Sequence, residues 1–244
     1  ARRHLRGGDR ARRCADGAVN GGNSRSIVIR DLGRQDYVPL WRAMQRFTDA
    51  RNDETPDEIW FTEHPPVFTM ALTASKEHLL APGDIPGVQI DRGGQVTFHG
   101  IGQLMVYPLI DLSRSGIGVR RLVTALEQSI VDLAAEHSVS AAARKDAPGV
   151  YVDGDKLASV GLRIRRGCSF HGMALNVAVD LEPFSRINPC GYKNLGMTDL
   201  QRLGIDLGLS LASRRLLPHF LKHLGFADAN VIAADDGLPI TASG

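Results

Sequence analysis

The strongest constraint on the fold is a run of extended segments broken by two turn dipeptides. Asp153-Gly154 and Arg166-Gly167 are typical of tight hairpin turns, since both place glycine where the backbone must turn sharply. The segments that they separate are Gly149 to Val152, Leu157 to Arg165 and Cys168 to Val179. We therefore predict a three-stranded antiparallel meander, and the rest of the chain must pack around it.

The remaining periodicity indicates an α+β fold with mixed sheets flanked by helices. Apolar residues recur at helical spacing over residues 37–51 and 118–137. A last helix is expected around residues 216–224, ending at Gly225, and Thr198-x-x-Gln201 fits a capping box. We expect these to form a small C-terminal helical segment. Further strands are expected at residues 27–29, 58–63, 67–70, 88–92, 95–99 and 103–109.

The two ends of the chain differ from the part between them. Residues 1–24 carry six Arg and two Asp and almost no large apolar residue. Such a segment buries too little surface to become ordered, so we predict a disordered basic tail. A basic arm for nucleic acid or an organelle-targeting leader is the alternative. One domain is expected over residues 25–234, and residues 235–244 are expected to fray.

Composition excludes several classes of function. The 244 residues have a net charge of +2, of which the tail holds +4, so the folded part needs no nucleic-acid partner. Three cysteines without framework spacing argue against a disulfide-stapled secreted domain. No apolar run approaches the roughly 20 residues that span a bilayer. We expect a cytoplasmic protein that does not bind membranes.

Cys190 is the first candidate for chemistry. It lies between Pro189 and Gly191, which rules out a regular helix or a central strand around it. Lys156 stands thirty-four residues upstream. If the fold brings the two together, the ammonium stabilises a thiolate and accepts its proton, and Cys190 becomes a nucleophile. The alternative is a small buried hydrophobe, which is the interpretation that we favour for Cys168.

Two glycine-containing stretches are candidates for a ligand pocket. Residues 92–103 hold four glycines with Arg92 and His99, as expected where the backbone comes close to a ligand, although ordinary hairpin turns explain them equally well. His171 before Gly172 could line a pocket or serve equally well as a hydrogen-bonded structural histidine. A dinucleotide turn at Gly116-Ile117-Gly118 lacks its third glycine, and His219 with His223 lacks the catalytic Glu and a third ligand, so we expect no nucleotide or metal there.

Together, four stretches resemble the lipoyl(octanoyl) transferase family, whose fold is that of biotin/lipoate protein ligases. They are Arg92 to Tyr107, Asp155 to Gly161, His171 to Asn176 and Asn188 to Gly191, and the resemblance covers most of residues 27–210. It implies an octanoyltransferase catalytic domain that takes an octanoyl group from octanoyl-acyl carrier protein onto Cys190. The acceptor would be a lysine on the lipoyl domains of 2-oxo acid dehydrogenase complexes or the glycine cleavage H protein.

The resemblance also implies a set of site residues. Lys156 would lower the pKa of Cys190, and neither a metal nor a cofactor would be needed. The octanoyl pocket would be lined by Arg92, Gly93, Gly94, Gln95, Val96, Thr97, Phe98, His99, Ser159, Val160, Gly161, Gly172, Met173 and Ala174. Apolar candidates for its wall are Val96, Phe98, Leu157, Val160 and Met173.

An ATP-dependent lipoate or biotin ligase is the alternative, because it shares the fold and a lysine in a similar position. Such ligases need a glycine/arginine phosphate loop and no cysteine, whereas here the loop has one Arg and Cys190 would be unexplained. A scaffold protein that only displays a surface to lipoyl domains would need neither Cys190 nor Lys156. The chain departs from the family pattern at Ala71, where glycine is usual, and at Ile101, where proline is frequent.

Overall fold

The computed structural model describes residues 26–72, 74–188, 195–226 and 230–234. The predicted tail over residues 1–24, the predicted frayed end over residues 235–244 and the nucleophile candidate Cys190 lie outside these ranges. Those three expectations therefore stay predictions.

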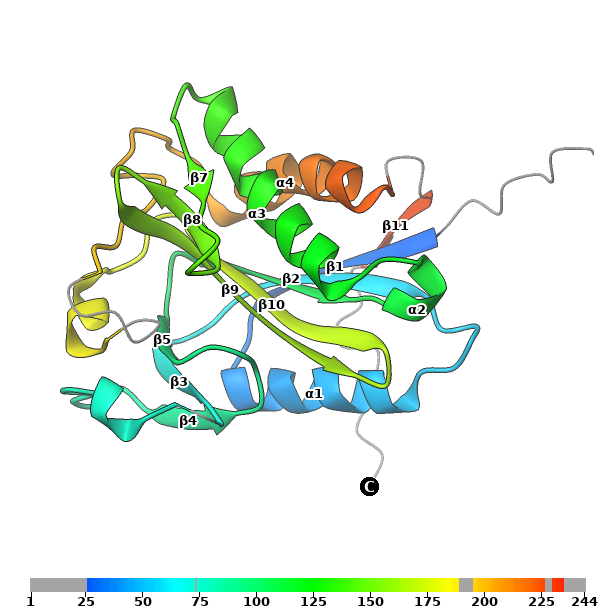
Figure 1. Cartoon of the computed structure of the whole chain (residues 1–244), viewed down its shortest axis with the longest axis horizontal. Coiled ribbons are helices and arrows are strands. Elements are labelled where there is room, and N and C mark those ends of the chain that lie inside the picture. The colour runs from blue at the N-terminus through cyan, green and yellow to red at the C-terminus, as the bar shows by residue number, and fades with distance from the viewer. Residues whose placement is uncertain (1–25, 73, 189–194, 227–229, 235–244) are drawn as a thin grey trace, which may run out of the picture.

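An eight-stranded mixed sheet forms the centre of the molecule (Figure 1). The predicted meander is confirmed as three antiparallel neighbours within it. Its middle strand, β9 (Asp155–Arg165), carries Lys156, and β10 (Cys168–Asn176) pairs with β9 on the side toward the middle of the sheet. In spatial order the strands are β11 (Asn230–Ala234), β1 (Ser26–Arg34), β2 (Asp57–Glu63), β6 (Gln103–Leu109), β10 (Cys168–Asn176), β9 (Asp155–Arg165), β8 (Gly149–Val152) and β7 (Ala142–Ala143).

Helices cover both faces of this sheet (Figure 1). Helices α3 (Val119–Glu136) and α4 (Leu209–Leu224) pack on one face, against Leu104 and Val106 of β6. Helix α1 (Tyr37–Ala50) packs on the other, against Met105 and Tyr107. Successive residues of a strand point to opposite faces, so β6 supplies both cores and is buried throughout.

A second, three-stranded sheet stands beside α1, in the order β4 (Gly87–Ile90), β3 (Val67–Ala71), β5 (Val96–His99). The three predicted strands between residues 88 and 109 therefore do not pair in sequence order. β4 runs parallel to β3, β5 runs antiparallel to it, and β6 continues into the large sheet. The glycine breaks between them mark a change of sheet rather than simple hairpins.

The C-terminal part differs from the prediction. The capping box at Thr198 is wrong: Asp199 accepts from the backbone N–H of Arg202, and residues 200–204 form turns. Helix α4 spans Leu209–Leu224 after Gly208, so it begins seven residues before the predicted start at Leu216, and it packs against α3 instead of forming a separate segment. Elements that the periodicity missed are the short ones, α2 (Leu112–Ser115), β7, β11 and the 3-10 turn η2 (Glu182–Arg186). The 3-10 turn η1 (Lys76–His78) matches the single helical turn expected at Lys76 to Leu80.

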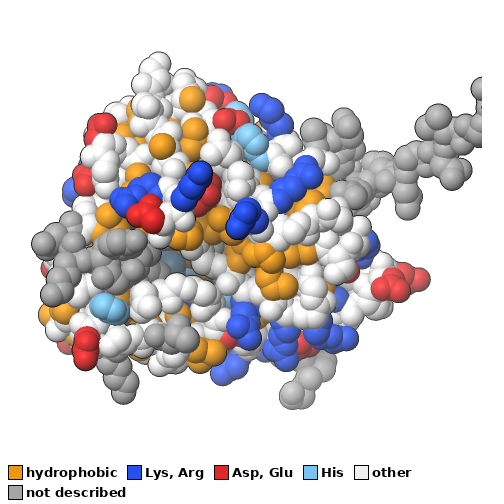
Figure 2. Space-filling view, in the orientation of Figure 1, with side chains coloured by type: hydrophobic (Ala, Val, Ile, Leu, Met, Phe, Trp, Pro, Cys, Tyr) orange, Lys and Arg blue, Asp and Glu red, His pale blue; other side chains and the backbone are white. Residues whose placement is uncertain are grey.

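Within the described ranges, no helix combines the length and the apolar character that crossing a membrane requires. In space-filling view, hydrophobic side chains are exposed near the middle of one face, with Lys and Arg side chains beside them (Figure 2).

Candidate active site

Lys156 is fully buried although it is the second residue of β9. Its ammonium lies 5.4 Å from the centroid of the Tyr151 ring on β8. Glu127 on α3 is nearby: its carboxylate accepts from the backbone N–H of Gly149 at 2.8 Å, burial raises its pKa, and the charge of Lys156 acts against that rise. A buried lysine needs such partners, because removing an ammonium from water is otherwise very unfavourable.

The chain that returns from Cys190 pairs with Lys156. The N–H of Lys156 donates to Gly196 O at 2.8 Å, and its carbonyl accepts from Thr198 N at 3.1 Å. On the other side of the undescribed residues 189–194, Asn188 N donates to His78 O at 2.9 Å. Both flanks of the Cys190 segment are thus anchored, one of them directly on Lys156.

A chain of buried hydrogen bonds connects the glycine-rich stretch to this point. Arg92 Nη2 donates to Thr69 Oγ1, whose hydroxyl lies 3.2 Å from His99 Nε2. His99 Nδ1 contacts Gln103 Oε1 at 2.8 Å, and Gln103 Nε2 donates to Asn176 Oδ1. The amide of Asn176 donates in turn to Thr198 O. Every donor faces an acceptor when the His99 ring is neutral with its proton on Nδ1.

A pocket opens between the small sheet and β6, β9 and β10. Twelve of the residues predicted to line an acyl pocket border it, brought together from three separate parts of the chain. They are Arg92, Gly94, Gln95, Val96, Thr97, His99, Ser159, Val160, Gly161, Gly172, Met173 and Ala174.

Two members of the predicted set do not border this pocket. Phe98 packs instead into a separate core cluster, with Phe68 and Phe184. Gly93 joins the loop to β9 through its N–H, which donates to Leu162 O at 3.1 Å. Leu157, proposed as an apolar wall, belongs to the core under α3 and α4. Phe98 and Leu157 were predicted to face the pocket but pack into core clusters, because neighbouring residues of a strand point to opposite sides of the sheet.

The pocket has four further lining residues, Tyr37, Met105, Tyr107 and His171. Tyr107 donates to Nε2 of His64, whose Nδ1 faces Gln35 O, so this ring is neutral also. Burial lowers the pKa of His64 to about 4 and that of His99 to about 3. Alternation along β6 could have suggested Met105 and Tyr107, but nothing in the sequence pointed to Tyr37.

Cys168, His219 and His223, for which we predicted no catalytic or metal-binding role, have other surroundings in the structure. Cys168 is buried, and burial raises its pKa. His219 and His223 on α4 contact Glu136 and Asp132 on α3. The described ranges contain no group of three His, Cys, Asp or Glu side chains placed to hold a metal ion.

The family model of the lipoyl protein ligase A/B catalytic domain matches residues 36–221, which include Lys156, the pocket and Cys190. The chain belongs to this family. Curated family members similar to it are named octanoyltransferase: one from Shewanella oneidensis is 57% identical over 83% of this chain and 97% of its own length. One from Erwinia tasmaniensis is 56% identical over 89% of this chain and 97% of its own length.

Solved structures support the same fold at much lower identity. A bi-partite lipoate protein ligase from Thermoplasma acidophilum is 12% identical, with a TM-score of 0.66 over 89% of this chain and 88% of that one. A lipoate-protein ligase A bound with ATP is also 12% identical, with a TM-score of 0.65 over 89% and 90%. The predicted α+β fold of the biotin/lipoate ligase type is confirmed.

Proposed function

We propose that this chain moves an octanoyl group from octanoyl-acyl carrier protein to Cys190, and from Cys190 to a lysine of a lipoyl domain. Octanoyl transfer in lipoate biosynthesis, an acyltransferase activity, is what relatives at 55–62% identity support. The carrier protein, the thioester on Cys190 and the individual acceptors are the finer parts of the proposal.

One observation carries the assignment of Cys190 and Lys156. A lysine with no exposed surface is paired through its backbone with Gly196, six residues beyond the candidate cysteine. A buried ammonium does not stabilise the fold, since burial opposes its charge. It does serve a neighbouring thiol that must lose and regain a proton.

The first half-reaction exchanges one thioester for another. The Cys190 thiolate attacks the acyl carbonyl, a new carbon–sulfur bond forms, and the bond to the carrier sulfur breaks. Lys156 holds the proton taken from the Cys190 thiol and donates it to the departing carrier thiolate. Thioester exchange is close to isoenergetic, so no ATP is required.

The second half-reaction makes the amide. The amine of the acceptor lysine attacks the acyl-Cys190 carbonyl, and the bond to Cys190 sulfur breaks. The incoming amine loses a proton to Lys156, and Cys190 returns to its starting state. The acceptors that we propose are the lipoyl domains of 2-oxo acid dehydrogenase complexes and of the glycine cleavage H protein. A related fold has been solved in a study of a lipoate protein ligase and its E2 lipoyl domain.

Intact mass after incubation with octanoyl-acyl carrier protein tests the proposal. We expect one octanoyl adduct on the wild type and none on Cys190→Ser, while Cys168→Ser, the matched control at a buried thiol, retains it. Addition of a lipoyl domain should discharge the adduct without ATP. An adduct that survives Cys190→Ser, or transfer that requires ATP, would contradict the mechanism and favour a ligase.

A further inference from the structure

His171 has a backbone conformation that is unusual for a strand. Its φ is +56°, in the left-handed region, although it sits in the middle of β10 and keeps its pairing with Leu162 of β9. A non-glycine residue there is strained, and such strain persists only where the surroundings hold it. The next residue is a glycine, since a Cβ at position 172 would collide with Val106 O.

The strained backbone changes the direction of the His171 side chain. Alternation would point it to the face of Met173, but its ring lies on the face of Phe170, with ring centroids 5.0 Å apart. On that face His171 Nε2 donates to Asp91 Oδ1 at 3.0 Å, and Asp91 also accepts from Trp41 and Gln45 of α1. The ring is therefore held in one orientation beside the pocket that it lines.

The second ring nitrogen of His171, Nδ1, can accept a hydrogen bond that no described residue donates. Burial lowers the pKa of His171 despite the Asp91 carboxylate, so the ring is neutral and Nδ1 is an acceptor. Nδ1 is buried and has no hydrogen-bond partner among the described residues. A buried acceptor without a donor is unfavourable, and an apolar group packed against it cannot supply one.

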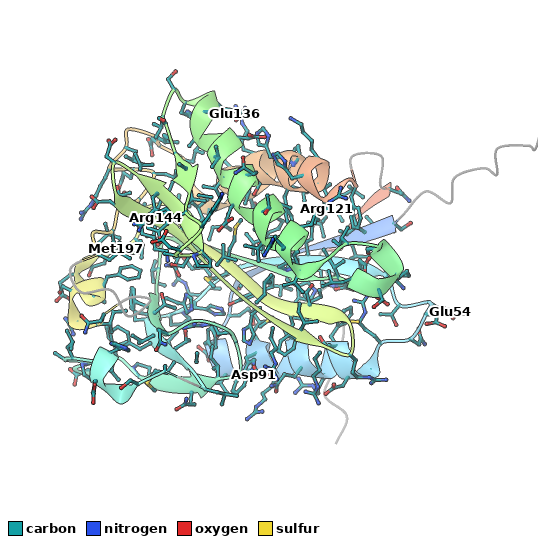
Figure 3. All side chains as sticks on the ribbon, viewed as in Figure 1. Glu54, Asp91, Arg121, Glu136, Arg144 and Met197 are labelled. Atoms are coloured by element: carbon teal, nitrogen blue, oxygen red, sulfur yellow. The ribbon has the colours of Figure 1, made fainter. Side chains whose placement is uncertain are left out.

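Strand register places His171 at the end of the pocket remote from Lys156. Ser159 pairs with Ala174, Gly161 with Gly172 and Leu162 with His171, so the pocket follows β9 away from Lys156. From Ser159 to Leu162 the strand advances about 10 Å, close to the length of an extended eight-carbon chain. In Figure 3, Asp91, the partner of His171, lies beside α1, and Met197, which forms an isolated β-bridge with Lys156, lies apart from it.

We propose that the fixed ring of His171 closes the far end of the acyl pocket as a polar floor and so limits the acyl chain to eight carbons. This inference rests on the proposed function, with the acyl carbonyl at the Lys156 end. A longer chain would have to displace the fixed ring or place its methyl end against an acceptor that it cannot satisfy. Asp91 acts through His171 by fixing its ring.

A competition between octanoyl- and decanoyl-acyl carrier protein at equal concentration tests this role. The ratio of ten-carbon to eight-carbon adducts on Cys190, measured by intact mass, is the readout. His171→Gly removes the floor and suits the left-handed backbone, and we expect the ratio to rise about tenfold, since one or two methylenes carry discrimination of this size. Ser138→Gly is the matched control, because Ser138 also has a left-handed backbone, φ +60°, but is exposed at the end of α3.

His171→Asn provides a second test, because asparagine tolerates the left-handed region and its side chain is shorter. A raised ratio in either His171 variant with an unchanged ratio in Ser138→Gly supports the floor. An unchanged ratio in the folded His171 variants that still form the octanoyl adduct overturns it. Absence of any octanoyl adduct on the wild type would instead overturn the proposed function, and the inference with it.

Discussion

At the scale of single residues, Gly149 decides whether Lys156 can occupy its buried position. Its φ is +137°, and a Cβ there would lie 2.7 Å from Lys156 Cε and would collide with Ala158 O. Its N–H also holds the carboxylate of Glu127. The absence of a side chain at this position is therefore what lets the lysine stem pass between β8 and β9.

Gly149→Ala is expected to displace Lys156 and slow acylation of Cys190 by about 100-fold, the size typical of losing a positioned proton carrier. Gly154→Ala is the control: Gly154 also has a positive φ, +93°, in the same hairpin, but a Cβ there meets nothing within 4 Å. Single-turnover formation of the octanoyl adduct measures both. Equal rates in the two variants would show that Gly149 matters only for backbone strain.

At the scale of elements, β10 contributes both to the pocket and to the surroundings of Lys156. Its face toward α1 forms one wall of the pocket, and its last residue, Asn176, holds the segment that pairs with Lys156. Asn176 is almost fully buried, accepts from Gln103 and donates to Thr198 O. The end of this strand thereby joins the pocket to the candidate catalytic lysine.

Asn176→Asp should lower the free energy of unfolding by about 1–3 kcal/mol, because a carboxylate oxygen would replace the donor that faces Thr198 O. Acylation of Cys190 should slow as the Thr198 segment shifts. Asn52→Asp is the matched control, since Asn52 is exposed and its Oδ1 only accepts, from Glu54 and Thr55. Denaturant unfolding measures the difference, and equal stabilities would contradict the role given to Asn176.

At the scale of the whole molecule, packing two sheets and α1 together buries several imidazoles in the neutral form. The pKa of His64 falls to about 4 and that of His99 to about 3, below the ordinary value near 6.5 that the unfolded chain retains. Their contribution to stability is complete above pH 6.5. It is lost as pH falls, because the unfolded chain binds protons that the folded protein does not.

We expect the free energy of unfolding to fall by about 1.4 kcal/mol per pH unit for each of these imidazoles between pH 5.5 and 4.5. Asp91 does not contribute in this window, since its pKa lies below the ordinary value and its effect is lost only in stronger acid. His64→Gln should reduce this slope by about 1.4 kcal/mol per pH unit, the contribution of one imidazole. His137→Gln, at an exposed position, should leave the slope unchanged. An identical slope in His64→Gln would contradict this account.

Much of this architecture could be predicted because the signals are local. The turns at Gly154 and Gly167 predict the meander, and apolar spacing predicts α1 and α3, since hairpins and amphipathic helices form from neighbouring residues. The family motifs predicted most of the pocket lining, with Phe98 and Gly93 as exceptions. Short elements such as β11 and α2 were missed because so few residues carry no periodicity.

By itself, the sequence determined the fold class, the family and the residue types available for acyl transfer, because these follow from local patterns and from shared motifs. Only the tertiary structure decided the rest. It separated β5 from β6 into different sheets, paired the backbone of the buried Lys156 with Gly196 and connected His99 to this point through Asn176. It also turned His171 into the pocket by a left-handed backbone. These are contacts between residues far apart in the chain, and no spacing along the chain encodes them.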